Sequence, residues 1–202
     1  MTRARPDLST KLVHLVKGDT MDMAFETLLN ILNERQLKGG NGNIKGGHNC
    51  VCFTETPLPQ LALSLSNRRS NKFKYRALGI LVDKAWAFGK GARPAIYQPD
   101  NDYNLLHETI KYRHVRYEPH NITDPVDFTW EREWRLKANN LSFSEAEVAV
   151  IVPKRRWADA LMTVFLEQFR DEIAGTGEQT PLRQPWHVIA LSDLGIDVPE
   201  EI

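Results

Sequence analysis

The segment with the clearest chemical potential is the ten-residue stretch FTWEREWRLK, which covers residues 128–137. If it forms a strand, its period of two places Glu131, Glu133 and Arg135 on one face and the tryptophans on the other. Two large aromatic side chains would anchor the strand, so the charged face would be held in a fixed position. The same pattern also suits a surface strand laced with Glu and Arg pairs, which individually contribute little stability.

Two neighbouring carboxylates repel each other, so either one is tuned as a base or Arg135 keeps it ionised. An ionised carboxylate beside the anomeric carbon of a sugar stabilises the oxocarbenium-like transition state of glycosidic cleavage. Release of nicotinamide from NAD is a reaction of this kind. Glu131 and Glu133 are therefore the candidate catalytic residues.

Two other polar positions stand at the middle or the end of apolar runs. His14 lies within the apolar run of residues 12–16 and would face away from Val13 and Leu15. Taken alone, His14 is better explained as a histidine satisfied within the core. Thr54 and Glu55 end a second run just before Pro57, where capping of the following helix is the simpler explanation.

The elements that must position these residues alternate without a regular βαβ pattern. Apolar periodicity and turn residues predict strands and helices, and five glycines between Gly39 and Gly47 predict a loop. The expected strands are residues 11–16, 49–54, 77–82, 92–97, 129–136, 147–152 and 186–191; the expected helices are 21–33, 57–67, 102–111 and 154–173. This mixture predicts an α+β fold in a single domain covering residues 1–202.

Composition excludes several classes of protein. The 202 residues are 42% hydrophobic and 9% aromatic, which is enough for a packed core. Lys and Arg together number 26, as do Asp and Glu, so no overall charge draws the chain to nucleic acid or a membrane. The apolar runs are too short to span a bilayer, and the polar first residues predict a cytoplasmic protein without a membrane partner. Cys50 and Cys52 lack the further ligands of a zinc site, so we expect two core thiols and no metal.

Basic residues gather locally although the total charge is zero. Between Arg68 and Arg93 there are eight Lys or Arg side chains, against one acidic side chain, Asp83. Such a run is typical of a solvated face and equally of a phosphate-binding one, and the sequence leaves both open.

The order of the elements resembles the ADP-ribosyltransferase superfamily. A strand with a histidine comes first, then an amphipathic helix, a loop, a strand ending in threonine, and a late strand with Glu-x-Glu. The resemblance implies a mixed, split β-sheet core flanked by helices, with NAD as co-substrate. It implies that His14 holds the adenosine-side ribose, that Thr54 supports the floor of the cleft and that Glu133 bonds the 2′-hydroxyl of the nicotinamide ribose.

Three further positions complete the site that this resemblance implies: Glu131 would orient the ADP-ribose acceptor, and Tyr97 and Arg135 would join His14 and Thr54 in binding NAD. The acceptor, whether a protein, a nucleic acid, a small molecule or water, is left open.

A second resemblance is to the abortive-infection G-type phage-resistance family. It rests on His14 with the helix behind it, on VCFTETPL at 51–58, on YRALGILVDKAW at 75–86, on GARPAIY at 91–97 and on EREWR at 131–135. Arg76 stands where that family has a glycine. This resemblance implies a role in phage defence or in a toxin–antitoxin pair, with a cognate toxin or antitoxin as partner.

Two other functions stay open at this point. The chain could be a non-enzymatic antitoxin or interaction module, with Trp134 and Arg135 as the energetic centre of its surface. A metal-dependent nuclease could be built from Asp127, Glu133 and Lys137, although Glu133 and Lys137 are four residues apart where two is usual.

Overall fold

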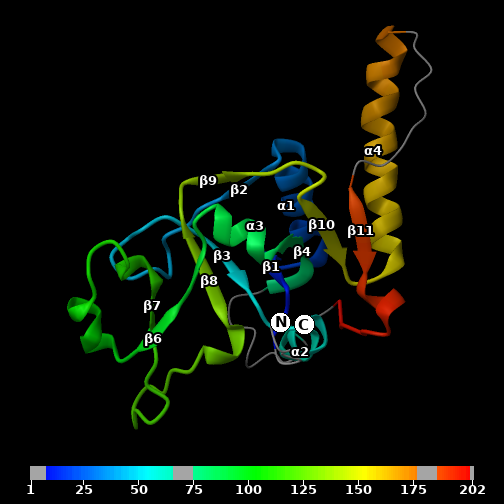
Figure 1. Cartoon of the computed structure of the whole chain (residues 1–202). Coiled ribbons are helices and arrows are strands. Elements are labelled where there is room, and N and C mark those ends of the chain that lie inside the picture. Colours follow the sequence, from blue (N-terminus) through cyan, green and yellow to red (C-terminus); the bar gives the residue numbers. More distant parts are fainter. Residues whose placement is uncertain (1–7, 66–74, 177–185, 201–202) are drawn as a thin grey trace, which may run out of the picture. The chain divides into compact units, whose positions relative to one another are not determined.

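The structure is a computed structural model, and it describes residues 8–65, 75–176 and 186–200. The fold is α+β, with helices and a mixed β-sheet (Figure 1). The chain forms two compact units, the first from residues 1–14, 34–61 and 82–143, the second from residues 15–33, 62–81 and 144–202. The single domain expected over residues 1–202 stays a prediction. No helix in the described part of the chain is long and apolar enough to cross a membrane.

Seven strands follow one another in the hydrogen-bonded order β11-β10-β4-β1-β3-β8-β5. The strands β1 (Lys11–Lys17) and β4 (Tyr75–Asp83) each contribute residues to both units. β4 is buried along nearly its whole length, as a continuous apolar run predicts. The helix α2 (Leu58–Leu65) is likewise shared between the units.

The first unit contains the residues of the candidate site. Its strands are mostly short, and 3₁₀ turns connect several of them. These elements are β2 (Gln36–Lys38), β3 (Cys50–Thr54), α3 (Lys84–Gly89), β5 (Arg93–Pro94), β6 (Ile96–Gln98), η1 (Asp100–Leu105), η2 (Lys111–Arg113), β7 (His114–Arg116), η3 (Thr129–Glu131), β8 (Glu133–Lys137) and β9 (Asn140–Ser142).

β3 and β8 form the best-defined pair of this unit and lie side by side in Figure 1. They are antiparallel, with Cys50 opposite Lys137 and Thr54 opposite Glu133. At the other edge of β3, Thr54 is also opposite Val13 of β1. The end of β3 therefore connects β1 to the beginning of β8.

The second unit contains the longer helices. They are α1 (Met21–Glu34), whose last residue belongs to the first unit, and α4 (Arg155–Thr176), with β10 (Val148–Val152), β11 (His187–Ala190) and the turn η4 (Leu191–Leu194). The Thr20 hydroxyl accepts a hydrogen bond from the Met23 N–H, which caps α1. Phe25 of α1 packs its ring 5.1 Å from that of Trp157 of α4. In the same unit the guanidinium of Arg76 is buried against the carbonyls of Gly18 and Asp19.

Three expected elements differ from those observed. The strand expected at 92–97 is divided into β5 and β6, because Pro94 has no N–H to continue a ladder. The helix expected at 102–111 is replaced by the turns η1 and η2. The strand expected at 129–136 begins only at Glu133, because Arg132 adopts a left-handed conformation with φ 45° and ψ 51° after the turn η3.

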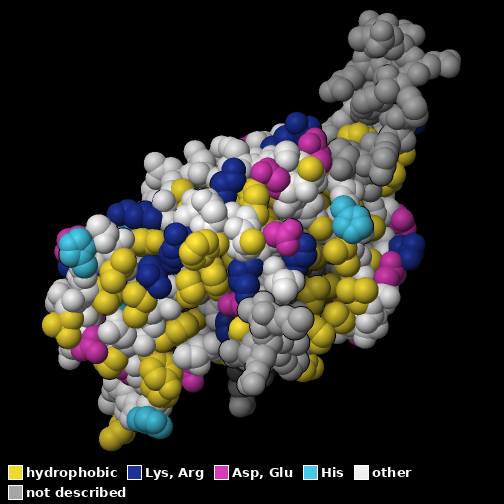
Figure 2. Space-filling model, in the orientation of Figure 1, with side chains coloured by type: hydrophobic (Ala, Val, Ile, Leu, Met, Phe, Trp, Pro, Cys, Tyr) yellow, Lys and Arg dark blue, Asp and Glu magenta, His cyan; other side chains and the backbone are white. Residues whose placement is uncertain are grey.

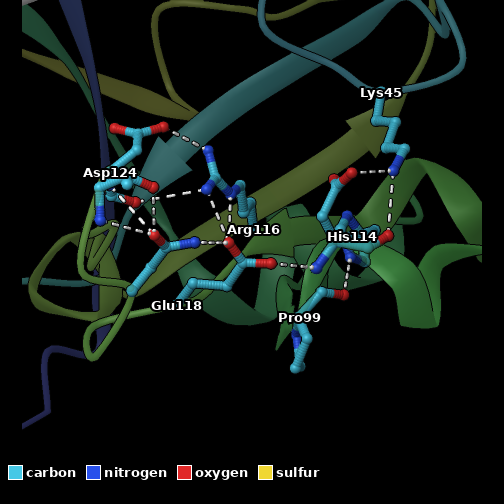
Figure 3. A network of polar contacts seen from close by, with 9 residues as sticks. Lys45, Pro99, His114, Arg116, Glu118 and Asp124 are labelled. Carbon is cyan, nitrogen blue, oxygen red and sulfur yellow. Dashed lines mark hydrogen bonds and ion pairs between the residues drawn. The ribbon is translucent and has the colours of Figure 1, made fainter.

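A polar network holds the segment that contains β6 and β7 (Figure 3). The Arg116 guanidinium binds the carboxylates of Glu118 and Asp124, and the Lys45 ammonium lies 2.7 Å from the Asp100 carboxylate. The Asp100 backbone N–H, followed by Arg116, lowers the pKa of Glu118 below its usual value. These contacts fix the segment from which Tyr97 projects.

Candidate functional site

A buried ion pair lies at the beginning of β8. The Arg135 Nε donates to one Glu133 carboxylate oxygen at 2.9 Å, and Arg135 Nη2 donates to the other at 2.9 Å. The side chains are 4% and 13% exposed, respectively. Because residues 133 and 135 are two apart on a strand, they share a face, as the sequence predicts. The Glu133 carboxylate is thus held in one orientation by a two-pronged contact.

The Nη1 group of Arg135 also has partners. It donates to the carbonyls of Tyr112 at 3.0 Å and His114 at 2.8 Å. A buried guanidinium is stable only where its donors have partners, so these two carbonyls are part of the arrangement that holds Glu133. Arg135 therefore acts on the site through Glu133.

The end of β3 clasps the turn that precedes β8. The Thr54 hydroxyl donates to the Glu131 carbonyl, and the Thr56 hydroxyl donates to the Trp130 carbonyl at 2.6 Å. Between them, the Glu55 N–H donates to the Arg132 carbonyl at 3.2 Å. Three consecutive residues thus bind three consecutive carbonyls of the turn. This clasp determines where Glu131 and Glu133 lie relative to β3.

Tyr97 of β6 reaches the same place. Its hydroxyl accepts a hydrogen bond from the Glu133 N–H at 2.8 Å. Burial raises the pKa of the Tyr97 phenol, and the nearby carboxylates of Glu133 and Glu131 act in the same direction, so it stays protonated at neutral pH. The phenolic hydrogen can then be donated to a further acceptor.

Glu131 does not share the strand face of Glu133. It ends the turn η3, and the left-handed Arg132 lies between the two glutamates. The expected alternation over residues 129–136 is therefore wrong for Glu131 and right for Glu133 and Arg135. The charge of Glu131 nevertheless contributes, after burial and the charge of Glu133, to the raised pKa of Tyr97.

His14 lies on the neighbouring strand but turns to the other face. Val13, Thr54 and Glu133 are directly opposite one another across β1, β3 and β8, so their side chains share a face. The His14 ring instead meets the edge of Phe53 at 5.9 Å, and its Nδ1 is 2.8 Å from the Cys52 carbonyl. The structure brings Thr54, Glu131, Glu133, Tyr97 and Arg135 together, and it places the His14 side chain on the opposite face of the sheet, apart from them.

A second buried charge was missed by the sequence reasoning. Glu55 is 8% exposed, and its carboxylate binds the Lys84 ammonium and accepts the Trp134 indole N–H at 2.8 Å. A buried tryptophan N–H needs a hydrogen-bond acceptor. The tryptophan of the expected strand at 129–136 was therefore a signal that an acceptor such as the Glu55 carboxylate lies near it. This contact fixes β8 to the beginning of α3.

One expectation about individual residues changes. Trp134 and Arg135 are 8% and 4% exposed, so they are core residues and cannot form the centre of an interaction surface. Asp127, invoked in the nuclease alternative, accepts hydrogen bonds from the N–H and hydroxyl of Thr129. Among the residues that the structure describes, no cluster of three or more His, Cys, Asp or Glu side chains is arranged to hold a metal.

The cysteines lie on the same strand pair. Cys50 is buried and Cys52 is half-buried, and both are free thiols, with Cys52 directly opposite Arg135. Burial raises the pKa of Cys50 to about 11 and raises that of Cys52 well above its usual value. Both are therefore neutral thiols at physiological pH.

Comparison with known proteins identifies no relative. No protein-family model matches the chain, and no curated protein or solved structure is significantly similar to it.

Proposed function

We propose that the chain binds NAD at the beginning of β8 and cleaves it to nicotinamide, transferring ADP-ribose to an acceptor. The proposal rests on contacts that join four residues from three distant parts of the sequence. Thr54 is directly opposite Glu133 and donates its hydroxyl to the Glu131 carbonyl, and the Tyr97 hydroxyl accepts the Glu133 N–H. β1, β3 and β8 are consecutive in the sheet, but the His14 side chain of β1 lies on the face opposite Thr54 and Glu133.

In this proposal Glu133 opposes the positive charge that develops on the ribose when the bond to nicotinamide weakens. A carboxylate stabilises that charge best when it is already oriented and needs no rearrangement. Arg135 supplies this orientation, since it binds both carboxylate oxygens along one edge. Arg135 takes two of the four lone pairs of the carboxylate and the Cys52 side chain takes a third, which leaves one that can accept a ribose hydroxyl.

The other residues have distinct roles. Thr54 is a positioning residue, because its hydroxyl donates to the Glu131 carbonyl and accepts the Thr56 N–H at 3.1 Å. Glu131 would orient the acceptor, and the Tyr97 phenol would donate to NAD. Four of the five N–H donors of Arg135 are engaged within the protein and its charge is paired with Glu133, so the negative charge of the pyrophosphate must be met elsewhere. His14, on the opposite face, is assigned to NAD by the resemblance alone.

The direct test is the release of nicotinamide. The purified protein is incubated with NAD, and free nicotinamide is measured for the wild type, Glu133→Gln and the matched control Glu167→Gln, which changes an exposed residue of α4. We expect Glu133→Gln to lower the rate by about 100-fold or more and Glu167→Gln to leave it unchanged. Equal rates in all three would remove Glu133 from the chemistry. Melting curves confirm that each variant is folded.

The setting of phage defence or of a toxin–antitoxin pair belongs to the same proposal. It rests on the abortive-infection resemblance. Expression of the wild type and of Glu133→Gln in a bacterial host tests it, with growth and cellular NAD as readouts. Loss of NAD and of growth only with the wild type supports a toxic activity.

A second candidate is a non-enzymatic interaction module, in which Glu133 has no catalytic role. Both Glu133 carboxylate oxygens are bound by Arg135, an arrangement that a purely structural ion pair would also have. In that case the folded wild type releases no nicotinamide with any acceptor and shows no heat of NAD binding.

A further inference from the structure

A group of exposed and half-buried cations and aromatic rings lies on α3, on the turn into β5 and beside it, within the first unit. We call it the α3–β5 surface, and it consists of Trp86, Phe88, Lys90, Arg93 and Arg113. Phe88 is 50% exposed. On the face drawn in Figure 2, Lys and Arg side chains border hydrophobic ones in the region of α3.

The local sequence explains how these side chains meet. Trp86 and Lys90 are four residues apart, so the Lys90 ammonium lies over the indole, 5.4 Å from the ring centroid. Gly91 then adopts φ 105°, a left-handed conformation that suits glycine, and the chain turns back. This turn brings the Arg93 guanidinium to 3.8 Å from the centroid of the Phe88 ring.

The cations of this surface have no acidic partners among the described residues. Arg93 donates Nη1 to the carbonyls of Phe88 and Ala92, and Arg113 donates Nε to the Pro94 carbonyl at 2.8 Å. Lys84, at the beginning of α3, differs because it is bound to Glu55. Contacts to carbonyls and rings leave the positive charge of Lys90, Arg93 and Arg113 uncompensated, so it can attract an anion.

Of the other members of the basic run, Arg76 is buried in the second unit. Arg68, Arg69, Lys72 and Lys74 lie outside the described residues. The sequence run as a whole therefore does not define the surface. Lys90 and Arg93 are the members of the run that the structure places on it.

We propose that the α3–β5 surface binds single-stranded nucleic acid. Uncompensated cations meet the phosphates, and an exposed ring with a guanidinium stacked on one side accepts an unpaired base. A duplex hides the faces of its bases, and an acidic peptide has no flat ring to stack. The combination of rings and cations therefore favours a single strand over either of these.

The surface borders the candidate site. Arg93 of β5 is directly opposite Arg135 of β8, and the Ala95 N–H donates to the Glu133 carbonyl at 2.7 Å. A strand bound there would run beside the beginning of β8. The proposal stands apart from the proposed function, because binding is measured without NAD, so either can fail alone.

The test is fluorescence anisotropy with a labelled thymidine 15-mer, a uridine 15-mer and an abasic strand of equal length. Phe88→Ala should weaken binding of the two base-containing strands at least 5-fold, since one stacked base contributes about 1–3 kcal/mol, and leave the abasic strand unaffected. Lys90→Gln and Arg113→Gln should each lower the slope of log affinity against log salt by about 0.7. Arg170→Gln, an exposed change on α4, should alter neither.

Three results would overturn the proposal. They are no binding at low salt, equal affinity for Phe88→Ala and the wild type, and preference for a poly-glutamate peptide over the 15-mers. A preference between the thymidine and uridine strands leaves the proposal standing and tells which nucleic acid is bound. Because Phe88, Lys90 and Arg113 lie at the surface, melting curves should show that the variants are folded.

Discussion

Two neighbouring regions of the first unit differ in how their charged side chains are partnered. At the beginning of β8, Glu133 and Arg135 are buried and pair with each other through two hydrogen bonds. On the α3–β5 surface, Lys90 and Arg93 are stacked on aromatic rings without a carboxylate among the described residues. A buried pair fixes geometry, whereas exposed cations provide attraction. In the two proposals made above, the first region positions a reacting group and the second attracts an anion.

The largest difference in stability between the two regions is expected when Arg135 is replaced. Arg135→Met leaves the Glu133 carboxylate and the carbonyls of Tyr112 and His114 without their donor. We expect unfolding free energy to fall by about 3–5 kcal/mol in urea titrations. Arg113→Met, on the exposed surface, should change it by about 0.5 kcal/mol or less. Equal losses would show that the two regions are not different in kind.

The reactivity of the two thiols of β3 tests whether the β3–β8 pair is buried. Because the pKa of Cys50 is raised to about 11, the thiolate is scarce at pH 8, and an aromatic disulfide reagent should react roughly 100-fold more slowly than with the urea-unfolded chain. The rate should rise with pH, since more thiolate is present as the pH approaches the pKa. Fast reaction of both thiols in the folded protein at pH 8 would contradict a buried β3–β8 pair.

A smaller effect is expected where the clasp is loosened. Thr54→Val keeps the shape of the side chain but removes the hydroxyl that binds the Glu131 carbonyl and the Thr56 N–H. We expect a loss of about 1–3 kcal/mol in stability, with Thr54→Ser near the wild type. If Thr54→Val is as stable as Thr54→Ser, the hydroxyl does not hold the turn.

The smallest effect belongs to the exposed surface. Lys90→Ala removes a cation stacked on the Trp86 ring, and exposed contacts of this kind contribute about 0.5–1 kcal/mol. Thermal melting should therefore move by only a few degrees. A loss as large as that of Arg135→Met would mean that Lys90 is structural, and its role in attracting an anion would have to be abandoned.

The sequence predicted the parts of the fold that depend on local periodicity. α1, β4 and β10 follow from helical spacing or from continuous apolar runs, and the shared face of Glu133 and Arg135 follows from the period of two. The position of Glu131 could not be predicted in this way. It depends on the clasp from Thr54 to Thr56, which joins segments more than seventy residues apart, and on the left-handed Arg132.

Which face of the sheet His14 occupies depends on the pairing register of the strands and could not be predicted from the alternation of residues along β1. Alternation along β1 separates His14 from Val13, but only the pairing of Val13 with Thr54 tells which side faces Glu133. Tyr97 was expected from a resemblance alone, and no local signal indicates that its hydroxyl binds the Glu133 N–H. Contacts between distant segments, which set register and turn geometry, account for these differences.

Calorimetric titration with NAD tests the central claim most directly, namely that the beginning of β8 forms the NAD site around Glu133. We expect saturable heat with the wild type and with Glu167→Gln, and affinity about 10-fold or more weaker with Glu133→Gln, since a hydrogen bond to a charged group contributes about 1.5–3 kcal/mol. Absence of saturable heat with the folded wild type, or equal affinities for all three proteins, would contradict it.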